Sequence, residues 1–151
     1  MPRTRGMIDI GGKDASRRTA VARGVIDLGP AAFKVVGDGT SKKGDVLETA
    51  KIAAVMAAKN TPRMIPLCHP ILIESIAVDF ALDTERACVK ATVTVTSHGK
   101  TGVEMEALCG AAAACLTIYD MLKYTGKAMT ITEVCLLEKT GGKSGDYKRH
   151  D

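Results

Sequence analysis

The sequence contains no tryptophan and few other aromatic residues. Phe and Tyr together make up 3% of the 151 residues, whereas 46% of the residues are hydrophobic. The core must therefore consist mainly of aliphatic side chains. The same scarcity weighs against a non-catalytic RNA-binding module, because such modules stack bases on aromatic side chains of their strands. In the strands predicted below, Phe80 is the one aromatic residue, and its side chain should face the core.

The five cysteines are odd in number, and none are spaced as Cys-x-x-Cys. Neither a disulfide framework nor a zinc site is indicated, and reduced, mostly buried thiols are typical of a cytoplasmic protein. No uninterrupted apolar run reaches the length of about 18 residues that a membrane span needs, and no apolar segment follows the basic N-terminal residues. We therefore expect a cytoplasmic protein that does not interact with a membrane.

The length and net charge of the chain indicate the number of domains and the kind of ligand. A chain of 151 residues fits a single domain. We place this domain over residues 1–151 and expect flexible ends at residues 1–6 and at about 145–151. The net charge of +4 favours small anionic ligands, and it falls short of the dense basic patch of a typical DNA-binding protein.

The hydrophobic pattern predicts a strand, a helix, two strands, a helix and a strand, in that order. These elements span residues 18–28, 44–60, 71–82, 85–97, 102–124 and 128–138. Residues 31–43 form a connection with room for a helical turn, and prolines prevent a continuous helix over 61–70. The order βαββαβ predicts an α+β, ferredoxin-like fold, with one antiparallel sheet and both helices packed on one of its faces.

Local signals support these elements. Asp45 is a candidate N-cap with Glu48 three residues later, as in a capping box. Apolar residues alternate along 85–97, and the short Asp83-Thr84 connection predicts a β-hairpin. In the last helix the predicted buried stripe consists of Val103, Ala107, Ala111, Ala114, Ile118 and Met121 or Leu122.

Three carboxylates lie along that last helix. Glu104 and Glu106 differ by about 200° around the axis, and Asp120 lies about 21 Å beyond Glu106 along it. One compact pocket cannot contain all three from a single chain, so either the ligand is long or two subunits assemble the site. Taken alone, Glu104 and Glu106 are also explained by the favourable interaction of carboxylates with a helix N-terminus.

Lysines accompany these carboxylates. Asp120 and Lys123 are three residues apart, which is also the spacing of an ordinary surface ion pair. Lys43, Lys123 and Lys139 flank separate elements that the predicted fold can bring to one edge. A lysine at such a site transfers protons if its pKa is lowered, and otherwise it holds a phosphate by its charge.

Two Gly-Lys-Ser/Thr segments invite comparison with a phosphate-binding loop. The P-loop pattern needs another glycine five residues before the one that precedes the lysine, but Thr94 and Leu137 occupy those positions. A P-loop GTP hydrolase is therefore disfavoured. The glycine-rich segment 141–145 either cradles phosphate through its N–H groups or is a solvated turn.

His69 lies in a segment that the following Pro70 keeps extended. This stiffness favours a functional role over simple packing. No second histidine or carboxylate stands at ligand spacing, so we predict no metal site.

Five short segments give the most specific functional signal. They are KGDV (43–46), IPLCHP (65–70), GKTGVEMEAL (99–108), TIYDM with a lysine two residues on (117–123), and K-x-GGKSGD (139–146). In this order and at these spacings they resemble the cyclic pyranopterin monophosphate synthase family of molybdenum cofactor biosynthesis. The resemblance implies a lyase that converts (8S)-3′,8-cyclo-7,8-dihydroguanosine 5′-triphosphate into cyclic pyranopterin monophosphate and diphosphate.

The resemblance also implies the functional residues and the assembly. The catalytic candidates are Lys43, Asp120, Lys123 and Lys139. The substrate-binding candidates are Arg18, Leu67, Cys68, His69, Glu104, Met105, Glu106 and Lys143. The implied assembly is a homohexamer, a trimer of dimers with sites at the dimer interface. No cofactor is required with certainty; Mg²⁺ is compatible with the triphosphate, although no carboxylate cluster demands it. No nucleic acid partner is expected.

Overall fold

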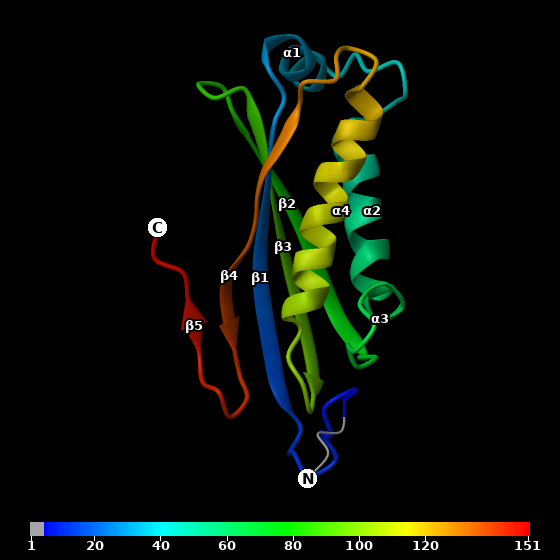
Figure 1. Cartoon of the computed structure of the whole chain (residues 1–151). Helices are drawn as coiled ribbons and strands as arrows, with labels where there is room; N and C mark the ends of the chain where they lie inside the picture. Colours follow the sequence, from blue (N-terminus) through cyan, green and yellow to red (C-terminus); the bar gives the residue numbers. More distant parts are fainter. Residues whose placement is uncertain (1–4) are drawn as a thin grey trace.

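Alternating apolar and polar residues form an antiparallel sheet in the computed structural model, which describes residues 5–151 (Figure 1). The strands span Ser16–Asp27 (β1), Ile73–Asp83 (β2), Cys88–Gly99 (β3), Thr130–Thr140 (β4) and Tyr147–Lys148 (β5). Their order in the sheet is β2-β3-β1-β4-β5. The order β2-β3-β1-β4 is that of a ferredoxin-like sheet, so the predicted α+β fold is confirmed.

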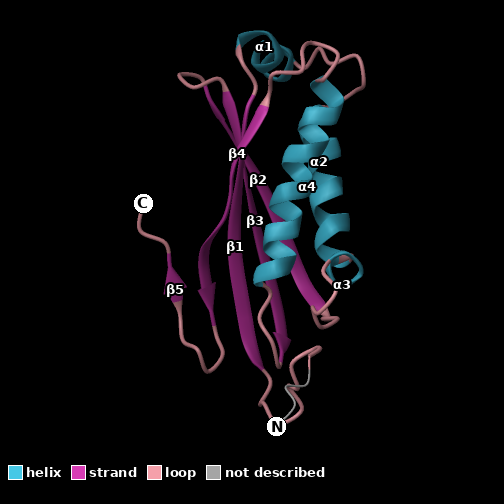
Figure 2. Cartoon of the chain, in the orientation of Figure 1, coloured by secondary structure: helices cyan, strands magenta, loops and turns pink. Residues whose placement is uncertain are grey.

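Two long helices pack side by side on one face of this sheet (Figure 2). They are α2 (Val46–Lys59) and α4 (Glu104–Leu122), and the shorter helices are α1 (Pro30–Asp38) and α3 (Thr61–Met64). The predicted N-cap of α2 is confirmed, because Asp45 Oδ1 accepts a hydrogen bond of 3.0 Å from the Glu48 N–H. The cap fixes the point at which the preceding lysine-bearing loop enters the helix.

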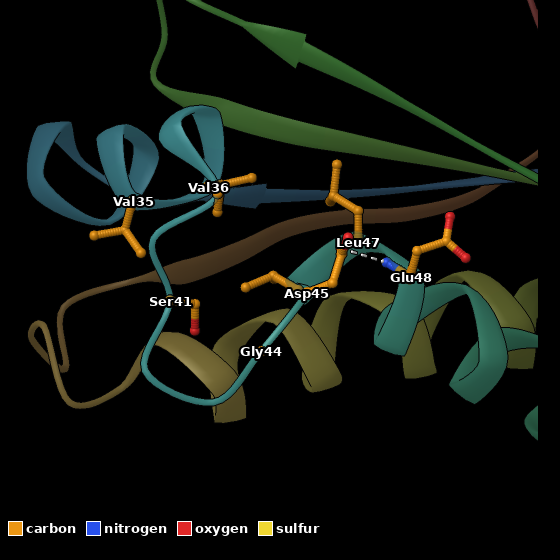
Figure 3. A pocket seen from close by; sticks show the side chains of 9 residues that line it. Val35, Val36, Ser41, Gly44, Asp45, Leu47 and Glu48 are labelled. Atoms are coloured by element: carbon orange, nitrogen blue, oxygen red, sulfur yellow. Dashed lines mark hydrogen bonds between the residues drawn. The ribbon is translucent and has the colours of Figure 1, made fainter.

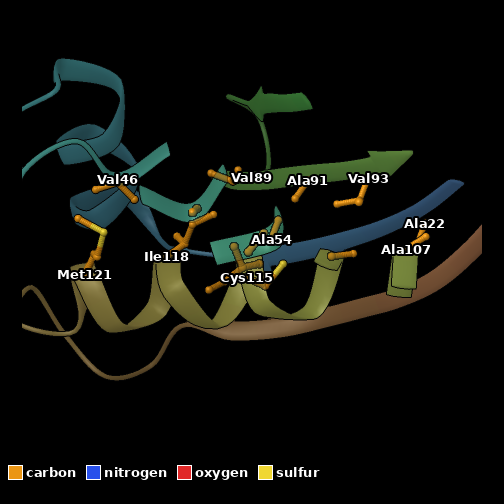
Figure 4. Packing of buried hydrophobic residues seen from close by; sticks show 14 of the residues in the cluster. Ala22, Val46, Ala54, Val89, Ala91, Val93, Ala107, Cys115, Ile118 and Met121 are labelled. Atoms are coloured by element: carbon orange, nitrogen blue, oxygen red, sulfur yellow. The ribbon is translucent and has the colours of Figure 1, made fainter. Parts of the chain in front are cut away.

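Small side chains allow α4 to lie close to the sheet. The predicted stripe is confirmed, since Ala107, Ala111, Ala114 and Ile118 are fully buried, beside strand residues such as Val93 (Figure 4). A Cβ on Gly24 of β1 would lie 2.7 Å from Cys115 Sγ and 2.8 Å from the Ala111 carbonyl oxygen, so only glycine fits there. This close contact fixes α4 along β1, with its two ends toward opposite ends of the sheet.

The hydrophobicity of α4 extends around the whole helix. By length and composition it is the one helix in residues 5–151 that could cross a membrane, with a mean hydropathy of 1.4. Half of that stretch is buried inside the fold, and buried core helices share this composition. The expected absence of a membrane partner therefore stays a prediction.

Three features differ from the sequence-based expectations. Helix α1 occupies much of the predicted connection, with Pro30 at its start and the Gly39 N–H bonded to the carbonyls of Val35 and Val36 at its end. The β2–β3 turn extends to Ala87, which has a positive φ of 50°. Strand β5 was not predicted; it pairs with Glu138 and Lys139 of β4.

The expected flexibility of the chain ends stays a prediction as well. Residues 1–4 lie outside the described residues. At the other end, the segment after Gly145 contains β5 and a hydrogen bond of 2.7 Å from the Arg149 N–H to the Leu137 carbonyl.

Candidate active site at the two ends of α4

Asp120, near the C-terminal end of α4, lies between two lysine ammonium groups. Lys123 Nζ is 2.8 Å from Asp120 Oδ1, and Lys43 Nζ is 3.5 Å from Asp120 Oδ2. Lys43 Nζ also donates a hydrogen bond of 3.0 Å to the Asp120 backbone oxygen. The structure thus brings together three of the four catalytic candidates, which we call the lysine–aspartate cluster.

The ion pairs determine the charge state of this cluster. The hydrogen bond from Lys123 lowers the pKa of Asp120, and the charges of Lys123 and Lys43 lower it further. The same hydrogen bond raises the pKa of Lys123. In the single chain the charged form of Lys123 is therefore favoured, which suits this lysine to holding phosphate by its charge rather than to acting as a neutral base.

Local hydrogen bonds hold the loop that carries Lys43. Its backbone N–H donates to Ser41 Oγ at 3.2 Å, and the neighbouring Lys42 N–H donates to the Tyr124 hydroxyl at 3.0 Å. Gly44 has a φ of 102°, a conformation that favours glycine, immediately before the Asp45 cap. The loop is thereby fixed between α2 and the end of α4, which aims Lys43 at Asp120.

A cavity of about 470 Å³ lies beside this loop (Figure 3). Its lining combines apolar side chains of α1, including Val35 and Val36, with Asp45 and Glu48 at the start of α2. Neither Lys43 nor Asp120 lines it. Ser41 and Gly44, which flank Lys42 and Lys43 in the loop, do line it.

At the opposite end of α4, Glu106 is almost completely buried, with 1% of its surface exposed. Its Oε1 atom accepts a long hydrogen bond of 3.9 Å from the Cys68 thiol, whereas its Oε2 atom has no partner. Burial raises the pKa of Glu106, and the nearby Glu104 raises it further. Burial likewise raises the pKa of Cys68. A buried oxygen without a partner is a candidate contact for a polar group of a ligand.

The other substrate-binding candidates of this region are more exposed than Glu106. Glu104 and Met105 are half-buried in the first turn of α4, and His69 is half-buried next to Cys68. Leu67 is 61% exposed. The α3–β2 loop and the start of α4 therefore bring Cys68 and Glu106 together, while their neighbours still face solvent.

Arg18 belongs to the same end of the molecule. It is 8% exposed, and its Nε donates a hydrogen bond of 3.0 Å to the Gly99 carbonyl, immediately before the segment that leads into α4. Gly142 lies against the Arg18 guanidinium so closely that a Cβ would collide with Nη1. Its φ of 84° favours glycine for a second, independent reason.

A cavity of about 230 Å³ opens beside Arg18. Lys143 lines it together with Lys13 and Ser16, and the Ser16 hydroxyl is buried without a partner. The sequence pattern did not single out Lys13 or Ser16, because neither stands in a motif and only the fold places the start of β1 and the segment before it beside Arg18. The glycine-rich segment thus lies against Arg18, beside a cavity that is lined by three basic side chains and by Asp14.

Lys139 lies with this group and not with the lysine–aspartate cluster. It is paired with Ala20 near the end of β4, and its Nζ lies 3.5 Å from the Gly141 carbonyl. Lys139 is nine residue steps from Thr130, at the opposite end of β4, which is a distance of about 30 Å along the strand. The expectation that Lys43, Lys123 and Lys139 share an edge is therefore not met within one chain.

No metal site accompanies either group in the part of the chain that the structure describes. Across residues 5–151, no three His, Cys, Asp or Glu side chains are placed so that they could hold a metal ion together.

The ferredoxin-like α+β fold carries ion-paired lysines at one end of α4 and a buried carboxyl and arginine at the other. This combination is more typical of an enzyme than of a binding module. The model of the MoaC family matches residues 7–142. The chain belongs to this family, which is the cyclic pyranopterin monophosphate synthase family, so the resemblance inferred from the sequence is confirmed. It is an enzyme of molybdenum cofactor biosynthesis.

Proposed function

We propose that the protein is a cyclic pyranopterin monophosphate synthase, a lyase that converts (8S)-3′,8-cyclo-7,8-dihydroguanosine 5′-triphosphate into cyclic pyranopterin monophosphate and diphosphate. The observation that carries this proposal is the Lys43–Asp120–Lys123 cluster in a chain of the MoaC family. It supplies fixed positive charge and a carboxylate within one hydrogen-bond network.

The cluster suits the phosphate chemistry of this reaction. A hydroxyl derived from the ribose attacks the α-phosphorus, and diphosphate leaves. Charged lysines stabilise the negative charge that develops on the phosphate oxygens. Lys123 donates a proton or holds a phosphate oxygen by its charge. Asp120 orients Lys123 and accepts a proton when the purine-derived ring is opened and rebuilt.

The other end of α4 suits recognition. Glu106, Glu104 and His69 read the guanine-derived edge, and Glu106 Oε2 offers an unused acceptor or, when protonated, a donor. Leu67, Cys68 and Met105 contact the substrate around this carboxyl. Arg18 and Lys143 hold phosphate oxygens, and Lys139 acts as a further cation in the reaction.

The distance between the two groups bears on the assembly. The stretch from Glu106 to Asp120 spans about 21 Å of helix, so one copy of the substrate reaches both groups more easily when they come from different chains. A homohexamer formed as a trimer of dimers, with sites at the dimer interface, meets this requirement. Mg²⁺ accompanies the triphosphate if it is needed at all. The enzyme acts in the cytoplasm, without nucleic acid or membrane.

Direct turnover tests this proposal. The purified chain is supplied with the 3′,8-cyclised substrate, with and without Mg²⁺, and diphosphate release and pterin formation are measured. We expect both products in equal amounts. Hydrolysis of GTP, without conversion of the cyclised substrate, would contradict the proposal.

A further inference from the structure

The glycine-rich segment between β4 and β5 is closed at its base by the Asp146 side chain. Strand β4 ends at Thr140 and β5 begins at Tyr147, so Gly141 and Asp146 are the first and last residues of the connection. The Asp146 Oδ1 atom accepts a hydrogen bond of 3.2 Å from the Gly141 N–H. This bond therefore joins the two ends of the segment directly.

The backbone of the glycine-rich segment needs such a bond. Gly141, Gly142 and Gly145 have positive φ values of 91°, 84° and 76°, in the region that favours glycine. Because glycine reaches many other conformations as readily, a single conformation persists only where further contacts select it. Strand β5 adds only two residue pairs, both beyond Asp146. The Asp146 bond thus acts where the backbone is least restricted.

The same segment touches two basic residues of the candidate site. A Cβ on Gly142 would collide with the Arg18 guanidinium. Lys139 Nζ donates a hydrogen bond of 3.5 Å to the Gly141 carbonyl. Asp146 binds the N–H of that same Gly141, so losing the Asp146 bond would free the stretch of backbone against which both basic side chains lie.

Asp146 is exposed and does not line the cavity beside Arg18, so it reaches a bound phosphate only through the segment. We propose that Asp146 is a positioning residue, which holds the Gly141 N–H and thereby keeps the glycine-rich segment in the conformation that aligns Arg18 and Lys139 on the phosphate groups of the substrate. The identity of that substrate rests on the proposed function. The role needs an acceptor oxygen and not a negative charge, so asparagine can replace Asp146.

Two substitutions of Asp146 test this role through steady-state kinetics. Asp146→Ala removes the acceptor, and we expect KM to rise about five- to tenfold while kcat falls by less. Asp146→Asn keeps an acceptor and should hold KM within about twofold of wild type. Asp38→Ala, which removes an exposed carboxylate of α1, is the control. An equal rise in KM for both Asp146 variants, no rise in Asp146→Ala, or a fall in both would overturn the proposal.

A double variant shows whether Asp146 acts through the glycine-rich segment. Gly142→Ala displaces the Arg18 guanidinium and so already removes the alignment that Asp146 maintains. In that background we expect Asp146→Ala to raise KM by less than about a further twofold. If the two substitutions multiply their separate effects, Asp146 acts independently of the segment and the proposal is wrong.

Binding of inorganic diphosphate to the full chain, measured by calorimetry without substrate, separates this proposal from the proposed function. We expect Asp146→Ala to weaken binding about five- to tenfold and Asp146→Asn to bind as wild type does. Equal affinities in wild type and Asp146→Ala, or no binding to wild type, would overturn the proposal. If binding depends on Asp146 in this way but the cyclised substrate is not converted, only the proposed function fails.

Discussion

The two ends of α4 hold the same kinds of groups in opposite physical states. At the C-terminal end, Asp120 and its two lysines are exposed and fully ion-paired. At the N-terminal end, Glu106 and Arg18 are buried, and Glu106 Oε2 has no partner. Exposed ion pairs rearrange easily around an incoming anion, whereas a buried group without a partner has already lost its water and is ready for a specific polar contact.

This difference assigns catalysis to the C-terminal end of α4 and substrate recognition to its N-terminal end. The exposed end provides mobile charge and protons, and the buried end provides a fixed, dehydrated contact. Substitutions at the exposed end should therefore reduce the rate with little effect on folding. Substitutions at the buried end should change both binding and stability.

The largest effect is expected from Lys43→Ala and Lys123→Ala. Each removes a charge that stabilises the transition state, and we expect kcat to fall by about a thousandfold. Because both lysines are exposed, thermal unfolding should change little. Lys51→Ala on the exposed side of α2 is the control for charge alone. Turnover near the wild-type rate in either variant would remove the cluster from the mechanism.

Gly142→Ala should give the next largest effect, because its Cβ would displace the Arg18 guanidinium. We expect KM to rise by about ten- to a hundredfold, while kcat changes less. Gly145→Ala is a closely matched control, since Gly145 also has a positive φ, of 76°, but has no atom within 4 Å of a Cβ. If both variants raise KM equally, backbone strain explains the effect and Arg18 does not.

Glu106→Gln tests the buried carboxyl through the pH dependence of stability. Burial raises the pKa of folded Glu106 above its unfolded value, so folding favours the protonated form. The contribution of Glu106 to wild-type stability should therefore be greatest below the ordinary glutamate pKa of about 4.3 and fall as the pH rises through the raised pKa, by about 1.4 kcal/mol for each unit of difference.

The glutamine variant should lack this fall, so its stability relative to wild type should increase with pH. Urea unfolding at a series of pH values measures it. Glu74→Gln on the exposed β2 edge is the control. Parallel curves for wild type and Glu106→Gln would show that Glu106 is not the group responsible.

Asp45→Ala should give the smallest effect. It removes the N-cap of α2 next to the Lys43 loop and should cost about 1 kcal/mol, or about 2–4 °C in Tm. Asp45→Asn keeps an acceptor and should retain most of the stability. Equal Tm values for the two variants would indicate that the cap contributes little.

The sequence alone predicted the main elements because their signals are local. The Asp45 cap, the stripe from Ala107 to Ile118 and the alternation along β3 each depend on side chains near in sequence. Helix α1 was missed because Val35, Val36 and Gly37 are poor helix formers, although Pro30 and Gly39 mark its ends. Strand β5 has two residues and forms only through its pairing with β4.

The sequence predicted which residues belong to the candidate site, but not which of them lie close together. The family motifs name Lys139 and Lys43 together, and only the tertiary structure places them in separate groups, with Lys139 opposite Ala20 in the sheet and Lys43 paired with Asp120. The contact between Cys68 and Glu106 joins residues 38 positions apart through the packing of a loop, which no local pattern encodes. The partnerless state of Glu106 Oε2 follows from the same packing.

The most direct test of a divided active site is complementation between two inactive variants. Arg18→Ala and Lys123→Ala are co-expressed in equal amounts, the mixed oligomers are purified, and diphosphate release from the cyclised substrate is measured. If the two ends of α4 come from different copies, each mixed dimer regains one intact site, and activity should return to about a quarter of wild type. If both groups of each site come from one chain, every site carries a substitution and the mixture will be as inactive as the separate variants.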